Sequence, residues 1–572
     1  MKKAIVMGLT LMLSAAMLFG CGGGNKTDST ENADNTAASE ETADTAEADA
    51  TAEAANVSKD PDVDAPESGQ VVVQGIEEDP DVLDPTLCNY ANSSFMLQNL
   101  FGGLFRMNAE GQVEPLYSAD YTVDETGTKY TFTLVDDAKW SDGTPLTAHD
   151  FEYSWKRVVD PEALSETAFS GFVLKNGKAC SEGTASVDDV GVKAVDDKTL
   201  EVELEAPTTY FINMLATTAF YPVKKDAIDA TTPWTKSAST YVSNGPFLMA
   251  QISPGEKYVL AKNPNYVKAD DIALDQIVYR IINSQEGQQF AYMNDEIDIT
   301  SFMTNEAMGS YKESGEYFVT PRLGLYFMDF QTEHKPFDDA RVRKALALSI
   351  DRQAIITSII QGDNAPAFGF VPPGIPDTVD PTKDYRDTAG NMFEEDVEKA
   401  KELLADAGYP NGEGFPTFRF ITLSPQLDKD IAQAMQEMWR TNLGIECEIE
   451  QYESKVYWGM HEEGDFDLAR DGYTGDYLDP LALLEQNYSE KQKGETRWAN
   501  AKYDALIDEN RSITDQAKRM ENAIEAEKLL MDEMPNFPVY FYNSPFVCKP
   551  DVKGVYRTVL GHIMYDNAVV ER

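Results

Sequence analysis

The chain has 572 residues, and its 98 acidic residues outnumber its 48 lysines and arginines, which gives a formal net charge of −50. Nucleic acids and anionic lipid surfaces would repel such a chain, so both are excluded as working partners. Roughly 500 residues follow the polar N-terminal segment. This is more than one hydrophobic core normally holds, so two or three domains are expected.

The N-terminus predicts a signal peptide of residues 1–20. Two lysines precede an uncharged apolar run, Ala4 to Phe19, which is shorter than the roughly 20 residues of a membrane span. Leu18, Gly20 and Cys21 resemble the lipobox of bacterial lipoproteins, which implies a lipid on Cys21 after cleavage before it. The alternative is an ordinary signal peptide with a chance cysteine. Under the lipid interpretation, this group alone holds the chain at the membrane.

Residues 21–69 are expected to form a disordered acidic tether. From Gly22 to Ser68 there are 13 acids against two lysines, a net charge of −11, and no aromatic residue occurs between Phe19 and Tyr90. Such a composition buries too little apolar surface to offset the chain entropy lost on folding.

The remaining chain alternates predicted strands and helices. Strands are predicted at 70–74, 130–134, 191–195 and 199–204, the last two forming a hairpin. Helices are predicted at 92–100, from 149, and at 338–349, 394–407 and 428–443. This mixture indicates an α/β protein, and no internal repeat is present.

The stretch from Asp467 to Pro480 predicts a strand that breaks at Gly472 and continues as an acidic loop, with a helix or turn restarting after Pro480. It carries Arg470 and several carboxylates, a complement to each end of a zwitterionic ligand. Loops at strand ends commonly bind ligands. The alternative for such an acidic chain is a solvated turn.

Motifs for catalysis or metal binding are absent from the sequence. Beyond Cys21 there are four widely spaced cysteines, whose pairing the sequence leaves open. The four histidines have no metal-ligand spacing, and no nucleophile elbow or phosphate-binding loop occurs. We therefore expect no enzyme activity, no cofactor and no metal.

Several long motifs resemble the extracytoplasmic solute-binding proteins of peptide ABC importers (family 5), most closely their oligopeptide-binding members. They are Lys139 to Phe151, Gly191 to Leu204, Val242 to Pro246 and Phe337 to Leu346. The similarity runs from about Asp84 to the C-terminal region.

The resemblance implies a periplasmic-binding-protein-like type II fold, a two-lobed venus-flytrap with an extra domain in the first lobe. Lobe I would comprise residues 70–101, 236–325 and 545–572, the extra domain 102–235, and lobe II 326–544.

The resemblance also implies ligand contacts. Asp476 matches an aspartate that pairs with the α-ammonium group of a peptide, and Arg470 matches an arginine near the ligand. For Arg470, a salt bridge to Asp467 or Asp471 is the structural alternative. Gly472, Tyr473 and Ala91 match positions whose main chain binds the peptide backbone. The aromatic candidates for the pocket are Tyr473, Tyr477 and Trp458.

The sequence departs from its relatives at several ligand-site positions. Relatives can carry a disulfide between positions equivalent to Gly324 and Thr474, which cannot form here. Basic anchors of peptide C-termini are replaced by Asp428 and His461, and a pocket tryptophan by Ser454. Peptide length and side-chain preference are therefore not predicted.

The implied function is capture of short peptides by a lipid-anchored monomer at the outer face of the cytoplasmic membrane. Its partners would be permease subunits and their ATPases. The alternatives are the same fold binding a nickel complex, haem, murein peptide, opine or oligosaccharide, or a tethered surface hydrolase or adhesin. Scarce histidine disfavours a metal, and Asp476 disfavours a neutral sugar.

Overall fold

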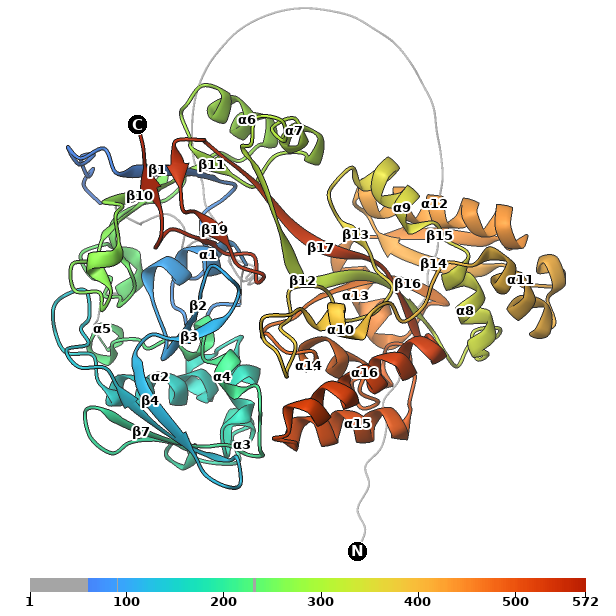
Figure 1. Cartoon of the computed structure of the whole chain (residues 1–572), viewed down its shortest axis with the longest axis horizontal. Coiled ribbons are helices and arrows are strands. Elements are labelled where there is room, and N and C mark those ends of the chain that lie inside the picture. The colour runs from blue at the N-terminus through green and yellow to red at the C-terminus, as the bar shows by residue number, and fades with distance from the viewer. Residues whose placement is uncertain (1–59, 90, 230–232) are drawn as a thin grey trace, which may run out of the picture. The chain divides into compact units, whose positions relative to one another are not determined.

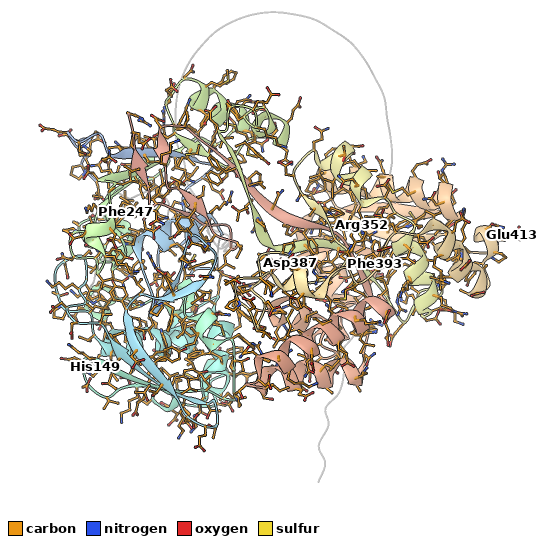
Figure 2. All side chains as sticks on the ribbon, viewed as in Figure 1. His149, Phe247, Arg352, Asp387, Phe393 and Glu413 are labelled. Carbon is orange, nitrogen blue, oxygen red and sulfur yellow. The ribbon has the colours of Figure 1, made fainter. Side chains whose placement is uncertain are left out.

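The computed structural model describes residues 60–89, 91–229 and 233–572. The predicted signal peptide, Cys21 and residues 22–59 of the predicted tether lie outside these ranges. Two large hydrophobic cores organise the described residues. One gathers side chains from 72–299 and from a returning segment, 546–570. The other gathers mainly side chains from 323–559. Phe247 is buried in the first core and Phe393 in the second (Figure 2).

Two long strands connect the cores, β12 (Tyr317–Phe330) and β17 (Asn536–Cys548). They pair antiparallel over most of their length and run side by side between the two halves of the fold (Figure 1). The chain therefore enters the second lobe along β12 and returns along β17.

The main sheet extends from both sides of this crossing pair. Its strand order is β15-β14-β16-β12-β17-β11-β1-β10-β9-β8, with β13 beside β17. Pairing is parallel between β14 and β15 and antiparallel between β16 and β12. The further strands are β1 (Val71–Ile76), β8 (Phe247–Ser253), β9 (Lys257–Lys262), β10 (Gln276–Ile281), β11 (Ile299–Thr300), β13 (Ala365–Pro366), β14 (Phe418–Leu423), β15 (Cys447–Tyr452) and β16 (Leu468–Thr474).

A smaller antiparallel sheet, β4-β5-β7-β6, lies within the segment expected to be an extra domain. Its strands are β4 (Ser118–Val123), β5 (Lys129–Leu134), β6 (Val192–Ala194) and β7 (Thr199–Glu203). Helix α2 (Ala148–Val159) starts with a capping box between Thr147 and Asp150, which satisfies free amides of its first turn. Trp155 of α2 is buried in the first core together with Phe132 of β5. The short strand pairs are β2 (Phe105–Met107) with β3 (Val113–Pro115), β18 (Val552–Lys553) with β21 (Val569–Val570), and β19 (Tyr556–Arg557) with β20 (Ile563–Met564).

The predicted helices at 338–349, 394–407 and 428–443 are confirmed as α8 (Ala340–Leu348), α11 (Val397–Asp406) and α12 (Gln426–Leu443). Glycine in a left-handed conformation ends α12 at Gly444. No helix among the described residues is long and apolar enough to span a membrane. The other helices are α1 (Ala91–Leu100), α3 (Gly177–Ser181), α4 (Phe211–Met214), α5 (Lys225–Ile228), α6 (Gln285–Met293), α7 (Asn305–Gly309), α9 (Arg352–Ile355), α10 (Tyr385–Ala389), α13 (Ser454–Glu463), α14 (Leu481–Leu484), α15 (Ala501–Ser512) and α16 (Gln516–Glu533).

The folded part begins earlier than the composition suggested. Residues 60–69, predicted to belong to the tether, lie against the first lobe. The Asp60 carboxylate accepts hydrogen bonds from Ser237 Oγ and from the amides of Ala238 and Ile252. The acid-rich composition could not predict that this segment is folded, because the donors of these bonds are about 180 to 190 residues away in the chain.

Candidate functional site

The C-terminal half of β16 presents a sheet edge with no strand beside it in the described chain. β12 pairs with β16 from Leu468 to Thr474, whereas β14 pairs on the other side with only Leu468 and Ala469. The strand continues through Gly472 to Thr474, so the predicted break at Gly472 is wrong. The ladder with β12 holds this segment extended.

The ladder fixes which main-chain groups face the open edge. Gly475 N donates a hydrogen bond to Leu323 O at 2.8 Å. Because alternate residues of an antiparallel ladder face the partner strand, Tyr473 also directs its main chain at β12. Gly472 and Thr474 direct theirs at the open edge, so the side chain of Tyr473 is the part of that residue left for a ligand.

Position 472 requires glycine because a tyrosine side chain of β17 packs over it. The hydroxyl of Tyr542 from β17 lies where a Cβ on residue 472 would be. The same ring covers Gly324, where an added Cβ would lie 2.9 Å from Tyr542 Cδ2. Glycine at both positions lets the aromatic ring pack directly on the backbone.

The loop after β16 is held by a buried ion pair. Asp479 accepts from Arg519 Nη2 of α16 at 2.6 Å, and both side chains are 4% exposed. The other oxygen of Asp479 accepts from Leu481 N at the start of α14. These bonds fix the C-terminal end of the turn that carries Asp476, and the bond from Gly475 N to Leu323 O fixes its N-terminal end.

Asp476 faces a cavity of about 870 Å³ and is itself exposed to it. The side chains of Tyr473 and Lys491 lie near enough to this carboxylate to favour its ionised form. Surrounding protein nevertheless removes enough water to raise the pKa of Asp476. Among the described residues, no lysine, arginine or histidine nitrogen lies within 4.0 Å of this carboxylate, so it can pair with a cation from outside.

Both lobes line this cavity. Tyr210 of the first lobe stacks on Tyr477, with ring centroids 4.6 Å apart and planes 7° from parallel. Asn213 Nδ2 donates to Leu478 O at 2.7 Å. Tyr473 and Tyr477, both predicted pocket residues, line the cavity together with Asp476.

Arg470 is engaged within the second lobe. Its Nε donates to Asp428 Oδ1 at 2.9 Å, and its guanidinium lies 4.7 Å from the ring centroid of Tyr326. Tyr326 and Asp428 hold the pKa of Arg470 above its usual value despite burial. The salt bridge expected from sequence therefore exists, but its partner is Asp428 and not Asp467 or Asp471.

A buried acid–histidine cluster lies on the opposite face of β16. His461 Nε2 is 3.0 Å from Asp329 Oδ2 and 3.7 Å from Asp471 Oδ2. Burial and the neighbouring Asp329 raise the pKa of Asp471 to about 7. Three potential metal ligands thus come together that sequence spacing did not reveal. His461 Nε2 lies within 4.0 Å of an oxygen of each carboxylate, so the imidazole already occupies the position between them.

Two further predicted residues lie elsewhere. Trp458 of α13 packs against Tyr457 and His461, with centroid distances of 5.2 and 5.5 Å, and does not line the cavity of Asp476. The resemblance made it a pocket candidate, whereas helix α13 turns the ring into a separate apolar cluster. Ala91 begins helix α1 in the first lobe.

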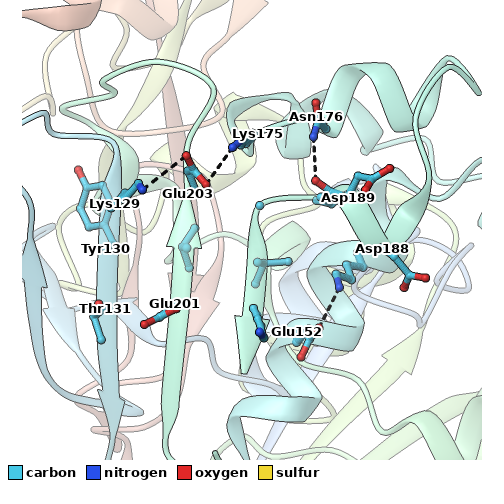
Figure 3. A pocket seen from close by; sticks show the side chains of 16 residues that line it. Lys129, Tyr130, Thr131, Glu152, Lys175, Asn176, Asp188, Asp189, Glu201 and Glu203 are labelled. Atoms are coloured by element: carbon cyan, nitrogen blue, oxygen red, sulfur yellow. Dashed lines mark hydrogen bonds and ion pairs between the residues drawn. The ribbon is translucent and has the colours of Figure 1, made fainter. Parts of the chain in front are cut away.

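A second cavity, of about 810 Å³, lies on the small sheet of the first lobe (Figure 3). Part of its charge is paired: Glu203 pairs with Lys175 at 3.1 Å and with Lys129 at 3.9 Å, and Glu152 pairs with Lys156 at 2.8 Å. The other charged residues of the lining, Asp188, Asp189, Lys193 and Glu201, are exposed. This cavity is lined by the first lobe alone, so the cavity beside Asp476, which both lobes line, is the better candidate.

Comparison with known proteins identifies the family. Residues 112–495 match the model of "Bacterial extracellular solute-binding proteins, family 5 Middle". The chain is a family-5 solute-binding protein.

Individual relatives agree over nearly the whole chain. The oligopeptide-binding protein OppA of Bacillus subtilis (strain 168) is 35% identical over 505 residues, which cover 86% of this chain and 91% of OppA. The probable deoxycholate-binding periplasmic protein YgiS of Escherichia coli (strain K12) is 33% identical, covering 85% and 90%. Among solved structures, the murein tripeptide-binding protein MppA of Escherichia coli in its unliganded open form has a TM-score of 0.76 at 30% identity, covering 88% of this chain and 97% of MppA.

In this family-5 protein, Gly324 and Thr474 are paired directly across β12 and β16. Positions that relatives can link by a disulfide are therefore neighbours here without a covalent bond. The four described cysteines, Cys88, Cys180, Cys447 and Cys548, are buried and form no disulfide among the described residues. Nothing in the described part of the lobe interface is held covalently.

Proposed function

We propose that this family-5 protein captures short peptides between its lobes and delivers them to an ABC importer. One juxtaposition carries the proposal: an open strand edge at Gly472 and Thr474 lies beside Asp476, a carboxylate with no close cationic partner in the described chain. A peptide supplies both complements, an extended backbone and an α-ammonium group.

The strand edge accounts for affinity that is independent of side chains. A peptide added along Gly472 and Thr474 forms main-chain hydrogen bonds, which every peptide can make. At Gly472 N such a bond replaces the one to Asp471 Oδ1, which is 2.6 Å long. Asp476 then selects for a free N-terminus, because a desolvated ammonium group needs a carboxylate partner. Tyr473 and Tyr477 provide apolar walls for the first side chains.

Binding is coupled to lobe closure, and the function requires no chemical step on the peptide. β12 and β17 connect the lobes, so a ligand that contacts both lobes favours the state in which they approach. The protein acts as a monomer with two permease subunits and their cytoplasmic ATPases.

Cys21 is proposed to carry the lipid that holds the protein at the outer face of the cytoplasmic membrane. The sequence Leu18 to Cys21 supports this assignment. Labelled palmitate should be incorporated into the full chain and not into a Cys21→Ala variant. Equal labelling of both chains would refute the assignment.

Calorimetry with matched peptides tests peptide capture. A tripeptide with a free N-terminus should bind, and its N-acetylated form should bind roughly 10- to 100-fold more weakly, because a hydrogen bond to a charged group is lost. The Asp476→Asn variant should no longer distinguish the two peptides. If wild type binds both forms equally, Asp476 does not bind the N-terminus.

The relative named as a probable deoxycholate-binding protein supports a second candidate, a non-peptide solute in the same cavity. Mass spectrometry of ligand released from protein purified under mild conditions distinguishes the two. A peptide supports the first proposal, whereas a sterol-like acid or another small solute replaces it.

A further inference from the structure

A cavity of about 220 Å³ beside the crossing strands contains two arginines without carboxylate partners. Its lining includes Arg322 of β12, and Arg557 and His562 of the hairpin formed by β19 and β20. Neither arginine forms an ion pair with any carboxylate of the described residues, although acids outnumber bases two to one in this chain.

The two guanidinium groups converge on the turn at Gly561. Arg557 Nε donates to Gly561 O at 2.8 Å, and its Nη1 donates to Pro545 O at 2.9 Å. A Cβ added to Gly561 would lie 3.9 Å from Arg322 Nε. That Nε is buried and has no hydrogen-bond partner among the described residues. The turn backbone fixes one guanidinium and leaves the other with an unused donor.

Burial without an anion lowers the pKa of Arg322, and burial together with Arg322 lowers the pKa of Arg557 to about 10. Arg511, which pairs with Glu485 at 2.8 Å, shows the opposite shift. Burial and the two arginines lower the pKa of His562 to about 3, so this imidazole is neutral at physiological pH. The cavity therefore holds two cations whose charge the surrounding protein does not balance.

Tyr542 of β17 links this cavity to the open edge of β16. Tyr542, whose hydroxyl covers Gly472, is an electrostatic neighbour of Arg322. Two acids also line the cavity, Glu77 and Glu78. Both are exposed, and Glu78 accepts from Asn92 Nδ2 at 3.0 Å. Neither glutamate forms an ion pair with Arg322 or Arg557.

We propose that Arg322 and Arg557 bind the C-terminal carboxylate of the captured peptide. The assignment rests on the proposed function and completes it, since Asp476 binds the ammonium end. Paired guanidinium donors suit the two oxygens of a carboxylate. Arg470 is unsuited to this role because Asp428 already occupies it. The predicted ligand is therefore a peptide with both termini free.

Calorimetry with three forms of one tripeptide tests the proposal: free at both ends, C-terminally amidated, and N-terminally acetylated. Wild type should bind the amide roughly 10- to 100-fold more weakly than the free acid. The Arg322→Met/Arg557→Met variant should bind the free acid as weakly as the amide and retain its sensitivity to N-acetylation. Arg322→Lys should restore part of the preference for the free acid.

Arg280→Met is the matched control, because Arg280 is half-exposed in the same lobe and pairs with Glu296. It should bind all three peptides as wild type does. If amidation changes nothing while acetylation weakens binding, the carboxylate assignment falls and the proposed function stands. If no form binds, both fall. If the double variant has lost its native melting transition, the amide and the free acid are compared on wild type and on Arg322→Lys instead. Equal binding of the two peptides by both proteins overturns the proposal.

Discussion

The hydroxyl of Tyr542 occupies the space that a side chain at residue 472 would need, so the residue beneath it must be glycine. Tyr542 belongs to β17 and Gly472 to β16, which lie on opposite sides of β12 in the sheet. The strand that returns to the first lobe therefore restricts the sequence of the strand edge offered to a ligand.

Gly472→Ala should destabilise the protein by about 1–3 kcal/mol and weaken peptide binding, because Tyr542 must move over the open edge. Urea unfolding and calorimetry measure the two effects. Gly459→Ala is the control, since a Cβ there meets nothing within 4 Å on helix α13 and should leave stability equal or higher. Tyr542→Phe should relieve part of the Gly472→Ala defect. An alanine variant with wild-type stability and binding would show that the ring moves freely.

Peptide affinity should fall on acidification at a higher pH than a fully hydrated aspartate would cause. The ionised carboxylate of Asp476 binds the ammonium group, and its pKa is raised because the surrounding protein removes water from it. Binding is therefore strongest above the folded pKa and is lost as pH falls through it, while the peptide amine stays charged over pH 4–7. Calorimetry across that range measures the loss. Asp476→Asn should bind weakly at every pH, and a wild-type slope in this variant would assign the titration to another group.

The sequence pattern was sufficient to predict those helices and strands whose own residues show the apolar periodicity of the element. Helices α8, α11 and α12 follow from their apolar spacing, and β5 follows from its alternation. The continuation of β16 through Gly472 could not be predicted, because it depends on pairing with β12, about 150 residues earlier. A glycine in the sequence alone indicates a turn. Only the pairing with β12 explains why the backbone at Gly472 is extended.

Site residues divide in the same way. Asp476 was predicted through resemblance, and it lines one cavity with the predicted Tyr473 and Tyr477. The partner of Arg470 was expected among its near neighbours in sequence, but it is Asp428 of α12. The convergence of Arg322 and Arg557 had no sequence signal at all, since a turn joined to a distant strand creates it.

The buried pair of Asp479 and Arg519 should be essential for the loop that carries Asp476. Arg519→Met leaves a buried carboxylate without its cation, which costs about 3–5 kcal/mol. Urea unfolding should show this loss, and peptide affinity should fall with it. Lys518→Met, on the exposed side of the same helix, is the control and should change stability by about 0.5 kcal/mol or less. The Asp479→Asn/Arg519→Met double variant should be more stable than Arg519→Met. If it is less stable, the charge of Asp479 is not what destabilises the single variant.

The acid–histidine cluster should make stability depend on pH through Asp471. Its folded pKa of about 7 lies above the value of about 3.9 expected for an unfolded aspartate. The folded state therefore favours the protonated carboxyl, and this contribution, complete below about pH 4, is lost as pH rises towards 7.

Asp471→Asn keeps the neutral form at every pH. Relative to wild type, its Tm should rise between pH 5 and pH 8, as wild type loses stability by ionising a carboxylate beside Asp329. Thermal unfolding at both pH values measures the difference. Asp387→Asn, at an exposed position of α10, is the control and should give the same difference from wild type at both. A Tm difference for Asp471→Asn that does not change with pH would show that His461 keeps Asp471 ionised throughout. In that case the histidine, already between the two carboxylates, would carry the charge that holds the cluster together.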